Sequence, residues 1–113
     1  MKADEDRRSR VATANADGTA EIVCAFEDNR LAMLLFGQHD QNLSFIERRL
    51  SVEATARGNH VAIRGQRDAC EHAKRVLDLL YQRLRSGQSL SLGDVDGAIR
   101  MTLAQGKIGR AHV

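Results

Sequence analysis

Apolar residues occupy every second position from residue 20 to residue 26, and glutamates stand at positions 21 and 27, where the chain reads A-E-I-V-C-A-F-E. This order places four apolar side chains on one face and both glutamates on the other, which is the pattern of a half-buried β-strand. The first nineteen residues mix charged side chains with Ala and Thr and show no such periodicity. Because they cannot bury enough apolar surface to offset the entropy of ordering, residues 1–19 are predicted to form a flexible N-terminal tail.

A short helix is predicted over residues 30–36, directly after this strand. Its leucines recur at intervals of three and four, the spacing of a stripe that packs on a core. Asp28 or Asn29 can serve as the N-cap, because a short polar side chain there accepts a hydrogen bond from an early helical amide. The predicted buried stripe consists of Leu31, Leu34 and Leu35.

A second helix, over residues 41–50, follows after a very tight corner. Gly37 is expected to end the first helix, and Asp40 is expected to cap the second by accepting hydrogen bonds from its first amides. The apolar residues of the second helix again repeat at intervals of three and four, at Leu43, Ile46 and Leu50.

A β-hairpin is predicted over residues 52–65, with Gly58 and Asn59 as its two-residue turn. The resulting register gathers the apolar pairs on one face, as a sheet with one buried face requires. It pairs Arg57 with His60, Ala56 with Val61, Thr55 with Ala62, Ala54 with Ile63, and Glu53 with Arg64.

A long helix follows the hairpin. Its apolar residues form a continuous face from residue 69 to residue 84, and Asp68 with Glu71 is expected to form a capping box at its start. The helix is expected to end near Ser86 and Gly87.

A further helix is predicted to begin at a second capping box, formed by Ser91 and Asp94, and residues 104–113 are predicted to form a loose tail or the start of a linker. The element order is therefore strand, helix, helix, strand, strand, helix, with one helix appended. Short connections between these elements predict one α+β domain over residues 20–103, with a three-stranded sheet and helices on one face.

Charge is distributed unevenly along the chain. The net charge of +2 does not by itself indicate nucleic-acid binding, but residues 41–85 hold nine basic against five acidic side chains. Arginine suits phosphate recognition through its planar fork of donors, although the same side chains can equally pair with carboxylates on a solvated face. The residues that could form a phosphate-attracting rim are Arg48, Arg49, Arg57, His60, Arg64 and Arg67.

No pattern of an autonomous catalytic site, metal site or membrane segment is found. Cys24 and Cys70 lie far apart in the sequence and are predicted to be free buried thiols, while the histidines lack metal-ligand spacing. No stretch approaches the roughly 18 apolar residues of a membrane span, and the N-terminus lacks a signal-peptide core. A cytoplasmic protein without membrane association is therefore expected.

The corner carries a resemblance to a known family. An apolar pair, Leu35-Phe36, precedes the segment Gly37-Gln38-His39-Asp40, which resembles the G-x-x-G loop of the KH signature, and the element order is that of the eukaryotic-type KH fold. More specifically, the sequence resembles the N-terminal KH-like domain of PhoH-like (phosphate-starvation-inducible) P-loop ATPases, a resemblance that covers roughly residues 20–103. The matching residues are Phe36-Gly37, Asp40, Asn42-Leu43, Ile46-Glu47, Leu50 and Arg57-Gly58-Asn59.

The resemblance implies a module that binds RNA and is not itself an enzyme. Members of the family join such a domain to a P-loop ATPase and are associated with RNA metabolism, including ribosomal RNA maturation beside an endoribonuclease. Single-stranded or ribosomal RNA and an endoribonuclease are thus the implied partners, and ATP, magnesium and homo-oligomerisation are implied for a full-length parent. The residues expected to contact RNA are Gly37, Gln38, His39, Asp40, Asn42, Arg48, Arg49, Arg57 and Arg64.

No nucleotide cofactor is expected in this chain. Around the pair Gly106-Lys107, Met101 occupies the position of the first P-loop glycine, and Ile108 occupies the position of the Ser or Thr that would hold magnesium.

Two alternative functions remain open. Asp40 replaces the second glycine of a KH loop, and a carboxylate there would occupy the helix amides and repel phosphate. This favours a protein-interaction or oligomerisation module that positions an ATPase domain or a nuclease partner. A DNA-binding helix-turn-helix over residues 29–50 is the third hypothesis, against which the flanking strands argue.

Overall fold

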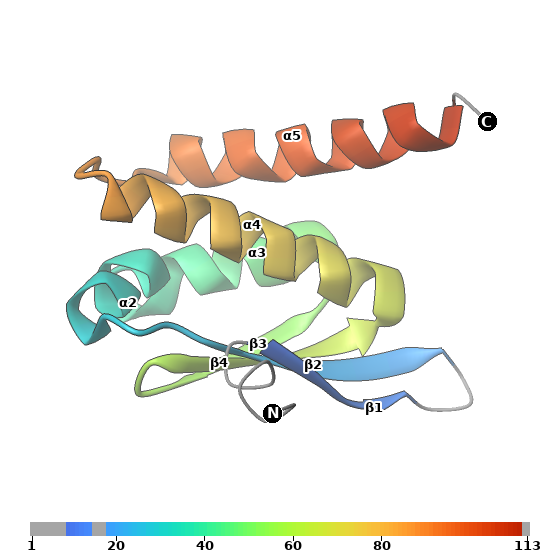
Figure 1. Ribbon diagram of the computed structural model, residues 1–113, viewed down its shortest axis with the longest axis horizontal. Helices are drawn as coiled ribbons and strands as arrows, with labels where there is room; N and C mark the ends of the chain where they lie inside the picture. The colour runs from blue at the N-terminus through green and yellow to red at the C-terminus, as the bar shows by residue number, and fades with distance from the viewer. Residues whose placement is uncertain (1–8, 15–17, 112–113) are drawn as a thin grey trace, which may run out of the picture.

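The computed structural model describes residues 9–14 and 18–111, which form a sheet covered on one face by helices (Figure 1). The α+β class and the predicted order from the first strand to the long helix are confirmed, with one helix appended. In chain order the elements are β1 (Ser9–Ala14), β2 (Thr19–Ala25), α2 (Asn29–Phe36), the short 3₁₀ helix η1 (Gln38–Asp40), α3 (Gln41–Leu50), β3 (Glu53–Arg57), β4 (His60–Gln66), α4 (Arg67–Arg85) and α5 (Leu92–Ala111).

The sheet is antiparallel, with the strand order β1-β2-β4-β3. The three predicted strands are β2, β3 and β4, and β1 adds a fourth beside β2. The predicted tail is therefore corrected for Ser9–Ala14, where Arg10 lies opposite Val23. Backbone hydrogen bonds to the open edge of β2 stabilise this strand without any apolar periodicity. Residues 1–8 and 15–17 of the predicted tail lie outside the described residues.

The β3–β4 hairpin has the register predicted from its sequence. Ala56 lies opposite Val61 and Ala54 opposite Ile63, and Gly58 in the turn takes a positive φ of 63°. Because side chains alternate across a strand, Val61 and Ile63 point toward the helices and are fully buried. On the outward face of the same strands, Glu53 lies opposite Arg64 and Arg57 lies opposite His60.

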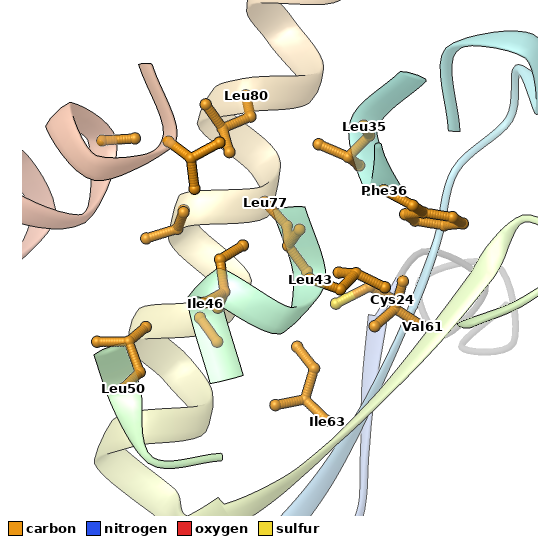
Figure 2. Packing of buried hydrophobic residues seen from close by; sticks show 14 of the residues in the cluster. Cys24, Leu35, Phe36, Leu43, Ile46, Leu50, Val61, Ile63, Leu77 and Leu80 are labelled. Carbon is orange, nitrogen blue, oxygen red and sulfur yellow. The ribbon is translucent and has the colours of Figure 1, made fainter. Parts of the chain in front are cut away.

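The core lies between the sheet and α2, α3 and α4, and Figure 2 shows side chains from all of these elements meeting there. The long helix α4 supplies Val76, Leu77 and Leu80, each fully buried, and each such side chain contributes about 1.5–3 kcal/mol by leaving water. On the side away from the sheet, α5 packs on α3 and α4 as a third layer (Figure 1). Its anchors are Val95 and Ile99.

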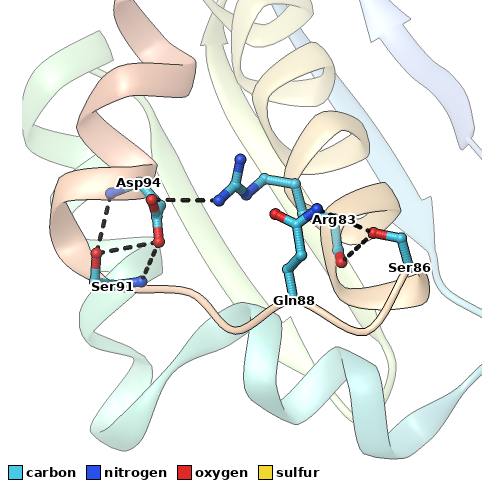
Figure 3. Close-up of polar contacts among 5 residues, drawn as sticks. All are labelled: Arg83, Ser86, Gln88, Ser91 and Asp94. Carbon is cyan, nitrogen blue, oxygen red and sulfur yellow. Dashed lines mark hydrogen bonds and ion pairs between the residues drawn. The ribbon is translucent and has the colours of Figure 1, made fainter.

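The helix starts agree with the predicted caps at two of four places. Asp28 caps α2, because its carboxylate accepts hydrogen bonds from the amides of Arg30 and Leu31. Ser91 and Asp94 form the predicted reciprocal capping box of α5 (Figure 3).

The prediction for α4 is corrected. Its N-cap position is Gln66, which makes no side-chain cap hydrogen bond, and Asp68 lies in the first turn. Strand β4 runs directly into α4, so no extended linker is available in which Asp68 could act as the cap. The carboxylate of Asp68 still lies at the positive end of the helix dipole. The fourth helix start, that of α3, lies at the corner described in the next subsection.

Helix α5 continues well beyond the predicted end. The expected loose segment 104–113 is helical as far as Ala111, and residues 112–113 lie outside the described residues. The first half of α5 is packed on α3 and α4, so each further residue adds one helical hydrogen bond without new nucleation. Within the described residues, neither α5 nor any other helix is long and apolar enough to cross a membrane.

Both cysteines are free and buried, as predicted. Burial raises the pKa of Cys24 to about 12, and it also raises the pKa of Cys70. The Cys70 thiol lies 3.7 Å from the carbonyl oxygen of Ala20. Both thiols are therefore protonated at neutral pH and behave as small apolar groups.

Candidate nucleic-acid interface at the α2–α3 corner

The corner between α2 and α3 has an unusual backbone. Gly37 ends α2 with a φ of 85° and a ψ of 171°, and its amide donates to the Met33 carbonyl at 3.1 Å. His39 and Asp40 then both adopt the left-handed region, with φ values of 54° and 56°. Such a conformation is rare for residues other than glycine and is mildly strained. Both side chains, together with that of Gln38, are exposed at the tip.

Gly37 is held in this conformation by Asn42. The buried Asn42 side chain donates from Nδ2 to the Leu35 carbonyl at 3.0 Å, which ties α3 to the last turn of α2. A Cβ atom on Gly37 would lie only 2.9 Å from the Asn42 side chain. Close approach and positive φ therefore both require glycine here. Asn42, one of the residues predicted to contact RNA, is buried and supports the corner from inside.

Asp40 does not cap α3, contrary to the sequence prediction. It occupies the N-cap position with left-handed φ and ψ, and its side chain makes no cap hydrogen bond. A capping side chain normally requires an extended backbone, from which its oxygen can turn back onto the helix amides. The carboxylate of Asp40 therefore does not occupy the first amides of α3. The positive end of the α3 dipole faces the exposed corner.

The two arginines predicted on α3 lie at its opposite end. Arg48 and Arg49 belong to the last turn, so about 12 Å of helix separates Arg49 from Gln41 at 1.5 Å per residue. Arg48 is exposed. Arg49 forms an ion pair with Asp96 on α5, and its guanidinium carbon lies 5.5 Å from the centre of the Phe45 ring.

Arg57 and Arg64 lie on the face of the sheet that the helices leave open. Arg64 stands opposite Glu53 on one side and Glu21 on the other, so two carboxylates flank it in register. No ion pair joins these side chains in the described part of the chain. Arg57 stands opposite His60 near the hairpin turn.

Arg64 lines a surface hollow of about 690 Å³. Its lining mixes one cation with two carboxylates, so its charge gives no preference for phosphate. The residues that line it are Thr19, Ala20, Glu21, Ser51, Val52, Glu53, Arg64 and Gly65.

The structure thus places the nine predicted RNA-contact residues in three separate regions. Five form or support the corner, two lie at the far end of α3, and two lie on the open face of the sheet. The arginines among them lie away from the corner, at the far end of α3 and on the open face of the sheet. The corner residues are Gly37, Gln38, His39, Asp40 and Asn42, the far-end residues are Arg48 and Arg49, and the sheet residues are Arg57 and Arg64.

The sequence patterns did not predict that two large apolar side chains beside the corner are exposed. Leu34 is 57% exposed and Met33 is 70% exposed, whereas Ala32, Leu35 and Phe36 form the buried stripe of α2. The prediction that Leu34 belongs to the buried stripe of α2 is therefore wrong, and Ala32 and Phe36 are buried beside Leu35. A small alanine gave too weak a hydrophobic signal to indicate the correct face.

The fold and the corner define a small α+β domain with a β-α-α-β-β-α core and one additional helix. No family model matches the sequence. PhoH-like proteins of Mycobacterium bovis and Mycobacterium tuberculosis are 35% identical to it over 83 residues, which are 74% of this chain and 24% of the relatives. The resemblance to PhoH-like proteins is confirmed: the chain is homologous to a segment of these proteins and spans about a quarter of their length.

A solved structure supports the fold. The crystal structure of a protein of unknown function from Aeropyrum pernix superposes with a TM-score of 0.59, over 84% of this chain and 52% of that one. The sequence identity is 16%, so this likeness concerns the fold alone.

Proposed function

We propose that this domain is a KH-like RNA-binding module of a PhoH-like protein that acts in RNA metabolism. The observation that carries the proposal is the exposed pair His39 and Asp40, two consecutive non-glycine residues in the left-handed region. Strained backbone of this kind persists only where the surrounding structure stabilises it, and it is found most often at binding and active sites. Here the support is the contact between Gly37 and Asn42.

The corner has the chemistry to take a single-stranded phosphate backbone. The positive end of α3 lies next to Gly37 at the exposed corner without a side-chain cap, which favours an anion there. The carboxylate of Asp40 opposes an anion at the same place. We therefore expect micromolar or weaker binding to single-stranded RNA, with shape contributing more than charge.

The remaining functions implied by the family resemblance belong, in this proposal, to the rest of a full-length parent protein. The relatives are about four times as long as the matched segment. ATP and magnesium binding, homo-oligomerisation and work beside an endoribonuclease are proposed for that parent, and ribosomal RNA is the proposed biological target.

Two opposite charge changes at the corner test the proposal. Binding of a fluorescein-labelled twelve-nucleotide single-stranded RNA is followed by fluorescence anisotropy at several salt concentrations. We expect Gln38→Glu to weaken binding and Asp40→Asn to strengthen it, each by about fivefold at 0.1 M salt, because one charge changes the salt slope by about 0.7.

Matched controls make the same chemical changes on α4, at Gln82→Glu and Asp78→Asn, which are both exposed and should leave binding unchanged. Equal effects at the corner and on α4 would contradict a binding site at the corner. Competition by duplex DNA that exceeds competition by single-stranded RNA would favour the helix-turn-helix hypothesis.

A second candidate function is a protein-interaction module, which the exposed pair Met33 and Leu34 favours. These side chains place apolar surface beside the corner. If they dock onto the rest of a PhoH-like protein, the double change Met33→Ser/Leu34→Ser should abolish association of this domain with the separately expressed remainder. The matched control Met101→Ser, also exposed, should not. A monomer at all concentrations with no such association would exclude this function.

A further inference from the structure

The ion pair between α3 and α5 suggests how RNA affinity is restrained. Arg49 and Asp96 lie 47 residues apart in the sequence, yet their side chains meet where α5 packs on α3. Arg49 is one of the residues predicted from the sequence to contact RNA, and it lies about 12 Å along α3 from the start of that helix at the corner. We propose that α5 acts as an autoinhibitory strap, in which Asp96 occupies Arg49 and competes with RNA phosphate for it. This inference rests on the proposed function.

Helix α5 is firmly packed on the core, so only the side chains of Arg49 and Asp96 move when RNA binds, and the helix stays in place. Val95 and Ile99, on either side of Asp96 in α5, are fully buried against the core. Asp96 itself keeps about a quarter of its side chain exposed, and Arg49 keeps 37%. A phosphate can therefore reach the pair from solvent without displacing α5.

Asp96 has a second cation within reach. Arg100, one helical turn further along α5, lies 3.2 Å from the other carboxylate oxygen. When Arg49 turns to a phosphate, the Asp96 carboxylate thus keeps a charged partner, which lowers the cost of the exchange. The hydrogen bond from Arg49, supported by the charge of Arg100, lowers the pKa of Asp96 below its ordinary value, so the competing carboxylate is ionised at neutral pH.

Arg49 is prepared for an anion even while it is restrained. Its guanidinium lies over the ring of Phe45, which is one helical turn earlier on α3. This cation–π contact remains when the carboxylate is exchanged and limits the rotamer entropy that binding must overcome. A phosphate can then take the position of the Asp96 carboxylate on the same planar donors.

The test compares Asp96→Asn with Asp78→Asn, a matched control whose carboxylate pairs with Lys74 on α4. Anisotropy titrations use the full chain and the same labelled single-stranded RNA. Removal of the competing charge should tighten binding about fivefold at 0.1 M salt and steepen the salt slope by about 0.7, whereas the control should match the wild type.

A double-mutant cycle separates the strap from a general effect of charge. If Asp96 acts through Arg49, the gain from Asp96→Asn disappears on an Arg49→Gln background. A gain that persists there, or an Asp96→Asn variant that binds like Asp78→Asn, would overturn the strap while the proposed RNA binding stands. Absence of RNA binding by every variant would instead overturn both.

Discussion

Two helix connections in this domain contain the same types of residue, but only one of them caps the helix that follows. Both the α2–α3 corner and the α4–α5 turn contain a glycine at positive φ, Gly37 and Gly87, and both bring an aspartate to the start of the next helix. In the α4–α5 turn, Asp94 exchanges hydrogen bonds with Ser91 and pairs with Arg83 (Figure 3). At the corner, Asp40 makes no such cap bond.

The difference separates a stabilising connection from a candidate binding site. The α4–α5 turn satisfies its own polar groups, so its residues serve the fold. The corner leaves the end of α3 without a side-chain cap and keeps two exposed residues in the left-handed region. Proteins tend to retain such locally unfavourable arrangements where they serve a function.

The largest expected difference between the two connections comes from their glycines. Gly37→Ala should lower the free energy of unfolding by about 4 kcal/mol, because backbone strain adds to a clash with Asn42. Gly87→Ala, where a Cβ atom would meet open space, should cost only about 1.5 kcal/mol of strain. Urea denaturation measures both changes.

A neighbouring substitution sharpens this result. On an Asn42→Ala background, Gly37→Ala should cost clearly less than in the otherwise unchanged protein. The side-chain clash is then gone, and only backbone strain and a 3.1 Å approach to the backbone nitrogen of residue 42 remain. Equal losses for the two glycines in the otherwise unchanged protein would show that the contact with Asn42 is unimportant.

A smaller difference is expected from the helix starts. Ser91→Ala should destabilise the domain by about 1 kcal/mol through the loss of a cap. Asp40→Gly should leave stability unchanged or raise it by up to about 1 kcal/mol, because glycine relieves left-handed strain and no cap bond is lost. Thermal and urea unfolding both report this contrast. A loss at Asp40 equal to that at Ser91 would mean that Asp40 supports α3 after all.

The smallest effect is a pH dependence in the α4–α5 turn. Hydrogen bonds from Ser91, helped by Arg83, lower the pKa of Asp94 below its ordinary value. A lowered folded-state pKa stabilises the fold at pH values above the unfolded-state pKa, about 3.9, and this contribution is lost as the pH falls through the folded-state value. Unfolding measured between pH 2 and pH 6 should show it in the wild type. The same scan should show a weaker acid dependence for Ser91→Ala, and an unchanged one would contradict the role of these hydrogen bonds.

Much of the fold could be predicted because its signals are local. The register of the β3–β4 hairpin follows from alternation and a two-residue turn, and both capping residues Asp28 and Ser91 lie within three residues of their partners. The candidate site was predicted only in part. The corner was located correctly, but the sequence left open whether the arginines form a phosphate-attracting rim, because sequence spacing gives no distance between a helix end and a sheet face.

Sequence by itself determined the order of the elements, the faces of the strands and the position of the corner, because turn residues and apolar periodicity act over a few neighbouring positions. Only the tertiary structure decided three further features. Strand β1 forms because β2 offers an open edge, and Asp40 fails to cap α3 because its backbone takes the left-handed conformation. Arg49 meets Asp96 because α5 packs on α3, a contact between distant segments that no local pattern encodes.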